Sequence, residues 1–313
     1  MKKILVLLAV FTAVWCASCS NEDDNDLQNV EEGKGGEGVI TMVVDVERDK
    51  EGINPDYMTF CIHSFKEGES ITVDWGDDWV EEFKTIATDE SEIGSGYSYW
   101  TDDLKHIYAK QKSYTITIKG NIKGLEYESN DYYAKLTSLD ASRCPALKYL
   151  YCTENKLTSL DVSGCTALEE LDCSSNELIS LDVSKCTKLT YLDCRSNELT
   201  SSLDVSKCMA LKELKCANNN LTSLNASGCT ALEELDCSYN ELTSLDVSKC
   251  TKLTVLDCRV NELTAEALNK IFTDLPKGNY GYIQIYGNPG TETCDKSIAE
   301  KKYWNVRDYY WSY

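Results

Sequence analysis

The chain repeats one segment six times, and this period constrains its fold more than any other feature. The copy at residues 157–177 reads LTSLDVSGCTALEELDCSSNE. The copies start at Leu136, Leu157, Leu178, Leu199, Leu221 and Leu242, at a spacing of 21 residues, except that the Leu199 copy holds one extra Ser and runs 22. A fixed period in the twenties with apolar residues in register predicts a mainly β solenoid, in which each coil buries its apolar side chains against its neighbours.

Each repeat has two similar halves, L-x-x-L-x-C-x-x-N and L-x-x-L-D-V-S-x-C. Leu-x-Cys in the first half alternates in, out and in, as the residues of a β-strand do. A buried Asn at the following turn is expected to hydrogen-bond backbone groups of neighbouring coils, which would otherwise lack partners. The Asn column consists of Asn155, Asn176, Asn197, Asn219, Asn240 and Asn261. The pattern is typical of a leucine-rich-repeat solenoid.

Twelve of the 16 cysteines fall in two columns of the repeat. One column is Cys144, Cys165, Cys186, Cys208, Cys229 and Cys250, and the other is Cys152, Cys173, Cys194, Cys216, Cys237 and Cys258. Neighbours in a column would lie about 4.8 Å apart, a distance at which a disulfide stays an alternative. Side chains in one column point the same way, however, so we expect buried free thiols. We expect no zinc site, because the repeats contain no CxxC pair and because His63 and His106 lie outside them.

The outward positions of the predicted strands define a candidate partner-binding face, the concave face of the solenoid. It consists of Tyr149, Tyr151, Glu170, Asp172, Tyr191, Asp193, Arg195, Glu213, Lys215, Glu234, Asp236, Asp257, Arg259, Tyr282 and Tyr286. Carboxylates run along it, and tyrosines gather near its start. Tyr provides a large contact area at low entropy cost, which favours a protein partner. The alternative is a solvated strand face with no partner.

A second acidic column lies in the other half of the repeat. Its members are Asp140, Asp161, Asp182, Asp204, Asn225 and Asp246. Stacked carboxylates repel one another unless they are hydrogen-bonded, protonated or bridged by cations. We expect these side chains to accept local turn N–H groups, with calcium bridging as the alternative.

Residues 1–18 have the features of a secretory signal peptide, with two lysines and an apolar run that ends in small residues. The ending Ala17-Ser18-Cys19 resembles a bacterial lipobox, although Cys16 stands where Leu is usual. The resemblance implies that Cys19 carries the lipid. Residues 19–37 are predicted to form an acidic flexible tether, and the acidic run at 20–26 resembles the surface-export signal of Bacteroidetes lipoproteins.

Residues 38–121 are predicted to form a small antiparallel β-sandwich of the immunoglobulin type. The alternating, β-branched stretches are 38–46, 58–64, 70–75 and 113–119. The motif VDWGDD at 73–78, a later His-Ile-Tyr and YTITI resemble a PKD-like domain, with Asp78 in place of its usual second Gly. For Asp74, Asp77, Asp78 and His106 we expect turn and strand chemistry, with a metal or catalytic role as the alternative.

The solenoid with its caps is predicted to span residues 122–288. Residues 122–130 fit a half-repeat and are expected to form an N-terminal cap coil. Residues 264–275 have apolar residues at helical spacing, and residues 280–288 return to the half-repeat, which predicts a helix-plus-strand C-cap. Residues 289–313 are expected to form a short helix and an aromatic tail that holds Trp304, Tyr309, Tyr310, Trp311 and Tyr313.

A block of three coils is duplicated within the repeats. Residues 157–198 and 221–262 are 64 positions apart and differ at six of 42 positions. Duplicated coils are easily lost or gained, so no single interior coil need be indispensable.

The form LxxLxCxxNxLxxLDVSxC resembles the 21-residue class of bacterial leucine-rich repeats called IRREKO. The whole layout is similar to Bacteroidetes surface lipoproteins with a PKD-like module, these repeats and a C-terminal cap. The resemblance implies a non-catalytic outer-membrane lipoprotein, exposed at the cell surface, that binds host or neighbouring-cell proteins. The alternatives are a glycan-binding accessory lipoprotein of a polysaccharide-uptake system, which exposed aromatic side chains would favour, and a structural coat protein.

Other functional classes find little support in the sequence. The formal net charge of −21 disfavours nucleic acid and bare anionic membrane, so the expected membrane contact is through the lipid alone. No GxSxG, P-loop or HExxH motif occurs, and the acidic residues follow the repeat without forming a catalytic pair. We therefore expect no enzyme, no cofactor and no metal.

Overall fold

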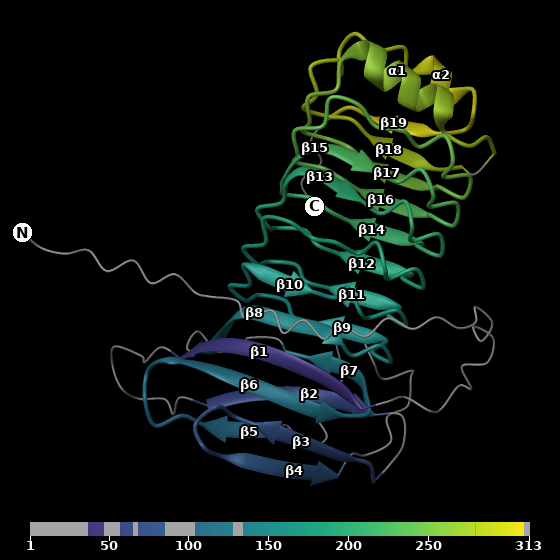
Figure 1. Cartoon of the computed structure of the whole chain (residues 1–313). Helices are drawn as coiled ribbons and strands as arrows, with labels where there is room; N and C mark the ends of the chain where they lie inside the picture. The colour runs from purple at the N-terminus through teal and green to yellow at the C-terminus, as the bar shows by residue number, and fades with distance from the viewer. Residues whose placement is uncertain are drawn as a thin grey trace, which may run out of the picture. The chain divides into compact units, whose positions relative to one another are not determined.

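The fold is a mainly β leucine-rich-repeat solenoid, seen in a computed structural model (Figure 1). The structure describes residues 37–46, 57–64, 68–84, 104–127, 134–278 and 280–309, so that Cys19, the predicted signal peptide and most of the predicted tether lie outside the described residues. The parallel strands of the coils are β7 (Ile122–Glu126), β9 (Tyr149–Tyr151), β11 (Glu170–Asp172), β12 (Tyr191–Asp193), β14 (Glu213–Lys215), β16 (Glu234–Asp236), β17 (Val255–Asp257), β18 (Tyr282–Gln284) and β19 (Asn305–Arg307). Each pairs in parallel with the next, so one strand per coil builds a continuous sheet.

The second half of each coil, which we call the return half, has fewer regular strands. They are β8 (Ala134–Arg143), β10 (Ser159–Asp161), β13 (Thr200–Asp204) and β15 (Asn220–Asn225). The extra Ser of the 22-residue repeat lies in β13, and the pairing of β13 with β15 shifts register between Ser201 and Ser202. Between these two pairs the register passes over Thr222, so the bulge places one more residue in β15 than in β13.

The N-terminal strands extend both faces of the solenoid. They are β1 (Gly38–Val46), β2 (Tyr57–Ser64), β3 (Ser70–Asp74), β4 (Val80–Lys84), β5 (Leu104–Ile107) and β6 (Ser113–Gly120), of which the sequence did not predict β4 and β5. Strand β2 pairs antiparallel with β7, and β1 pairs antiparallel with β8. The two sheets therefore run without a break across the predicted boundary between residues 121 and 122. The first coil would otherwise expose unpaired backbone groups at two strand edges, which β1 and β2 satisfy.

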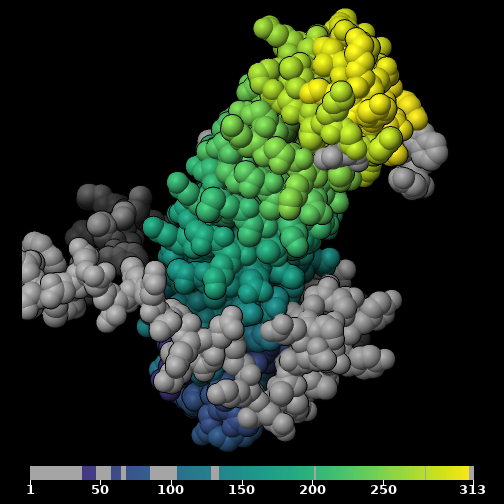
Figure 2. All heavy atoms as spheres, turned by 90° about the vertical axis from the view of Figure 1, so that its right-hand side faces the viewer, coloured from purple at the N-terminus to yellow at the C-terminus, as the bar shows by residue number. Residues whose placement is uncertain are grey.

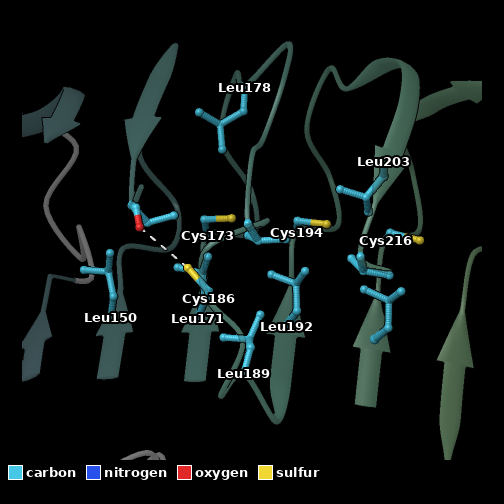
Figure 3. Close-up of a cluster of buried hydrophobic side chains, with 14 of the residues drawn as sticks. Leu150, Leu171, Cys173, Leu178, Cys186, Leu189, Leu192, Cys194, Leu203 and Cys216 are labelled. Carbon is cyan, nitrogen blue, oxygen red and sulfur yellow. Dashed lines mark hydrogen bonds between the residues drawn. The ribbon is translucent and has the colours of Figure 1, made fainter. Parts of the chain in front are cut away.

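The core of the coils consists of stacked leucines and cysteines (Figure 3). The twelve cysteines of the repeat columns are buried, free thiols in the structure. The thiol of Cys173 points to Asp193 O in the following coil at 3.6 Å, whereas that of Cys186 points to Val162 O in the preceding coil at 3.6 Å. Burial raises the pKa of Cys186 to about 12, so this thiol stays protonated at neutral pH. These two thiols thus donate to backbone carbonyls, a geometry in which they do not point at neighbouring thiols.

The Asn column makes the hydrogen bonds that the sequence predicts. Asn197 Oδ1 accepts the N–H of Leu178 at 3.0 Å, and its Nδ2 donates to the carbonyls of Cys173 and Cys194 at 3.0 and 3.1 Å. Equivalent bonds occur at Asn176, Asn219, Asn240 and Asn261. The column continues into the C-cap with Asn288, which accepts the N–H of Leu263. Each amide therefore joins its own coil to the preceding one.

The C-cap contains the predicted helix and one strand more than expected. Helix α1 (Ala265–Asp274) begins after Thr264, whose hydroxyl accepts the N–H of Ala267. Helix α2 (Ser297–Glu300) follows β18, and β19 then adds a last parallel strand inside the predicted aromatic tail. Trp304 does not belong to an exposed tail, because it is 2% exposed and donates its ring N–H to Pro276 O. In Figure 2 the colours follow the chain order of the coils, and the yellow C-cap forms the upper end.

Candidate functional site

The outward side chains of the parallel strands form one continuous surface, which we call the sheet face. Strand register places the first outward residue of each strand beside the first of the next, and the third beside the third. The first column reads Tyr149, Glu170, Tyr191, Glu213, Glu234, Val255 and Tyr282. The other reads Tyr151, Asp172, Asp193, Lys215, Asp236, Asp257 and Gln284. In the second column, Lys215 therefore separates two pairs of aspartates.

Tyrosines and their charged neighbours define the N-terminal part of the sheet face. The hydroxyl of Tyr151 donates to the carboxylate of Glu170. The ammonium of Lys215 lies 5.4 Å from the ring centroid of Tyr191, a cation–π distance. Burial, and then neighbouring carboxylates, raise the pKa values of both phenols, so the hydroxyls remain donors at neutral pH. These contacts hold the half-buried rings in place and preorganise them for contact.

The first aspartate pair combines an accessible and a buried carboxylate. Asp172 accepts the N–H and the hydroxyl of Ser174 at 3.0 and 2.7 Å. Asp193, its neighbour across the strands, is fully buried and lies 3.0 Å from the guanidinium of Arg195. Desolvation, and then the charge of Asp172, raise the pKa of Asp193 to about 6. Asp193 thus anchors Arg195, whose side chain is the exposed member of the ion pair.

The second pair repeats this arrangement three coils further along. Asp236 accepts from Ser238 as Asp172 does from Ser174. Asp257 is 5% exposed, lies 3.1 Å from the guanidinium of Arg259, and accepts from the side-chain amide of Gln284 at 3.0 Å. Desolvation and the charge of Asp236 raise the pKa of Asp257 to about 7.

Most of the sequence-predicted face is partly exposed, but three of its members are not. Tyr149, Asp193 and Asp257 are buried, so the expectation that they offer surface to a partner is wrong for them. Strand alternation predicts which side a residue points to, whereas neighbouring side chains decide whether solvent reaches it. The face that remains accessible is Tyr151, Glu170, Asp172, Tyr191, Arg195, Glu213, Lys215, Glu234, Asp236, Arg259, Tyr282 and Tyr286.

One face residue has no counterpart in the sequence prediction. The guanidinium of Arg307 on β19 lies 4.5 Å from the ring centroid of Tyr282, and Arg307 follows Gln284 in the strand register. The segment around it lacks the Leu and Cys of the repeat. Its one signal is a short apolar–polar alternation, which is too weak to predict a strand.

The aspartate column of the return half behaves as predicted. Asp182 and Asp204 accept the N–H groups of Ser184 and Ser206 at 2.9 and 2.8 Å, and the other members do the same. These bonds lower the pKa values of Asp182 and Asp204. Among the described residues, no group of three or more His, Cys, Asp or Glu side chains is placed to hold a metal ion.

The N-terminal turn residues also engage in local contacts. His106 Nε2 lies 2.8 Å from Asp77 Oδ2, and its ring stacks on Trp75 at 4.8 Å. Asp74 accepts the N–H of Gly76, and Asp78 has a positive φ of 71°. These contacts are turn and strand chemistry, as the sequence predicts.

Two segments of the chain, 145–185 and 210–248, match the family model described as Leucine Rich repeats (2 copies). A solved structure described as the functional domain of InlJ from Listeria monocytogenes, which includes a cysteine ladder, is 35% identical with a TM-score of 0.42, over 58% of this chain and 42% of its own. An internalin (inlF) from Listeria monocytogenes is 22% identical with a TM-score of 0.41, over 55% of this chain and 56% of its own. The plant peptide hormone receptor RGFR1 in complex with RGF2 is 24% identical with a TM-score of 0.39, over 53% of this chain and 32% of its own.

This chain thus spans between 32% and 56% of the length of these solved chains. No curated protein matches it. The repeats define a class, the leucine-rich-repeat solenoids, which typically act as protein-binding scaffolds without catalysis. Within the described residues, no helix is both long and apolar enough to cross a membrane.

Proposed function

We propose that this protein is a non-catalytic surface lipoprotein that binds a protein partner through the sheet face. The observation that carries the proposal is the preorganised state of that face. Two half-buried tyrosines and two arginines are held by hydrogen bonds, ion pairs and cation–π contacts. Side chains ordered before binding lose less entropy on association, and Tyr and Arg are the residue types that most often anchor interfaces.

The remainder of the proposal concerns location. The lipobox-like Ala17-Ser18-Cys19 and the acidic run after it support a lipid-anchored protein at the outer membrane, facing outward, of the Bacteroidetes type. The VDWGDD motif supports a PKD-like origin of the N-terminal strands. Labelling with a lipid precursor tests the anchor, since Cys19→Ser is expected to abolish incorporation and Cys16→Ser to leave it intact.

A binding experiment tests the sheet face itself. The full chain is immobilised and exposed to surface proteins of host and neighbouring cells. The test variant carries Tyr151→Gln and Tyr191→Val, which install the residues found at the same register in β18 and β17. Because both residues already occur at these positions in the fold, the variant is expected to fold normally and to bind its partner at least about tenfold more weakly.

The matched control is Ile179→Thr, which installs the residue that Thr243 provides at the equivalent position of the duplicated block. Ile179 is exposed and lies in the return half, outside the two columns of the sheet face. The control is expected to bind as the original chain does. Equal binding by the double variant would refute the sheet face as the binding surface.

A further inference from the structure

Two tyrosines project from the C-cap away from the core. Tyr280 lies between α1 and β18 and is 80% exposed, and Tyr303 lies between α2 and β19 and is 56% exposed. Their ring centroids are 5.3 Å apart, with an angle of 36° between the ring planes. Two neighbouring rings therefore form one open aromatic surface at the end of the solenoid.

The strand register shows that this pair departs from the repeat. Tyr282 pairs with Asn305, so Tyr280 and Tyr303 occupy the same position in two successive coils. In the earlier coils that position holds a fully buried leucine. These leucines are Leu147, Leu168, Leu189, Leu211, Leu232 and Leu253. At this position the last two coils therefore carry an exposed tyrosine in place of the buried leucine of the earlier coils.

The backbone at both tyrosines is strained. Tyr280 has a φ of 49° and Tyr303 a φ of 69°, in the left-handed region that bulky residues rarely adopt. Such conformations are unfavourable for residues other than Gly and persist where the surroundings enforce them. An exposed ring held in this way contributes little to the core, so the strain points to a role at the surface.

Hydrogen bonds between the two loops enforce the conformation. Gly278 donates its N–H to Lys302 O at 3.2 Å, and Asn305 donates its N–H to Gly281 O at 2.9 Å. The ring of Trp304 fills the space against Gly281, where an added Cβ would lie 2.8 Å from the indole. Trp304 thus takes over the burial that the leucines provide elsewhere, and the tyrosine pair sits on a rigid support.

We propose that Tyr280 and Tyr303 form a platform that binds a neutral glycan. The faces of aromatic rings carry partial negative charge, which attracts the weakly positive C–H groups of a pyranose ring. The phenol hydroxyls and the exposed amide of Asn305 supply hydrogen bonds at the margin.

Two further observations select this ligand. In the described part of the C-cap, the exposed large hydrophobic residues are all tyrosines, without the aliphatic side chains that would complete an apolar protein-docking patch. The net charge of −21 repels acidic polysaccharides, which leaves neutral ones. The platform uses none of the sheet-face residues, so it is a separate site.

Native gel electrophoresis through soluble neutral polysaccharides tests the proposal with the full chain. The probes are starch, a mixed-linkage β-glucan, a xylan and a mannan, with heparin as the acidic probe. At least one neutral polysaccharide is expected to retard the chain, and heparin is not. Tyr280→Asn combined with Tyr303→Asn is expected to weaken the retardation at least about tenfold, because both rings are lost.

Three comparisons keep the result interpretable. Asn tolerates a positive φ, so the double Asn variant is expected to have a thermal unfolding midpoint at or above that of the original chain. Replacing both tyrosines by Phe keeps the rings and is expected to keep most of the binding. Tyr239→Asn removes an exposed tyrosine with a φ of 54° outside the C-cap and is expected to leave the retardation by the neutral polysaccharide unchanged.

Several outcomes would overturn the platform. They are a lack of retardation by all four neutral polysaccharides, retardation that survives the double Asn change, or an equal loss with Tyr239→Asn. Binding of a protein to this pair in place of any glycan would overturn it as well. None of these outcomes bears on the sheet face, whose residues all the variants retain.

Discussion

In both halves of the coil an aspartate accepts a backbone N–H two residues further on, but its pKa shifts in opposite directions in the two halves. In the sheet half, Asp257 accepts the N–H of Arg259, and in the return half Asp246 accepts the N–H of Ser248. Burial, the larger cause, raises the pKa of Asp257 to about 7, whereas the bond from Ser248 lowers the pKa of the exposed Asp246. The comparison teaches that the turn determines where an aspartate sits, while solvent access determines its charge.

The turn slots of the two halves differ as well. The sheet half places Asn197 there, with side-chain hydrogen bonds to Leu178, Cys173 and Cys194. The return half places Cys186 there, with one weak bond from its thiol to Val162 O. The turn-slot side chains therefore join the coils by polar bonds along one half and mainly by apolar packing along the other.

The largest expected effect comes from emptying these two slots. Asn197→Ala removes these side-chain hydrogen bonds and leaves the buried N–H of Leu178 and the carbonyls of Cys173 and Cys194 without them. We therefore expect it to lower the free energy of unfolding by about 4 kcal/mol. Cys186→Ala removes one buried sulfur and is expected to cost about 1–2 kcal/mol. Urea denaturation measures both values. Equal losses would show that the two halves do not differ in the way the contacts suggest.

An intermediate effect concerns the pH dependence of the two aspartates. The folded pKa of Asp257 is raised, so the native state holds a proton that the unfolded chain has lost, and stability falls as the pH rises through about 7. Asn does not titrate, so Asp257→Asn removes this pH-dependent loss of stability. The free energy of unfolding of the variant minus that of the original chain is therefore expected to be about 2 kcal/mol larger at pH 8 than at pH 5.

Asp246→Asn is the matched control for this measurement. The folded pKa of Asp246 is lowered, so its contribution is complete above the ordinary pKa and is lost only in stronger acid. The difference in free energy of unfolding between Asp246→Asn and the original chain is expected to stay constant between pH 5 and pH 8. A flat difference for Asp257→Asn as well would show that Asp257 is ionised throughout.

The smallest expected effect concerns the backbone beside the Asn slot. Val260 has a φ of 51°, whereas the equivalent position in another coil holds Asn218 with a φ of 53°. A β-branched residue is strained there and Asn is not, so Val260→Asn is expected to stabilise the fold by about 1 kcal/mol. Ser196→Asn, at the matched position of the duplicated block, should give a smaller gain in thermal unfolding. A larger gain at Ser196 would contradict the strain at Val260.

The repeat itself could be predicted because its information is local. The period of 21 residues, the buried Leu and Cys columns and the Asn bonds all follow from side-chain alternation and from the need to satisfy buried backbone groups. The helix after Thr264 and the local bonds of the Asp column follow from capping and turn chemistry in the same way. Each of these features depends on residues within one coil or on its immediate copies.

What the sequence determined by itself is therefore the coil and the side to which each residue points. The tertiary structure decided the pairing of β1 with β8 and of β2 with β7, which joins segments distant in the chain through strand edges that carry no local signal. It also decided that Asp193 is covered while Arg195 is exposed, and that Tyr280 meets Tyr303. These outcomes depend on which neighbours close over a side chain, and packing supplies those neighbours only after the coils have stacked.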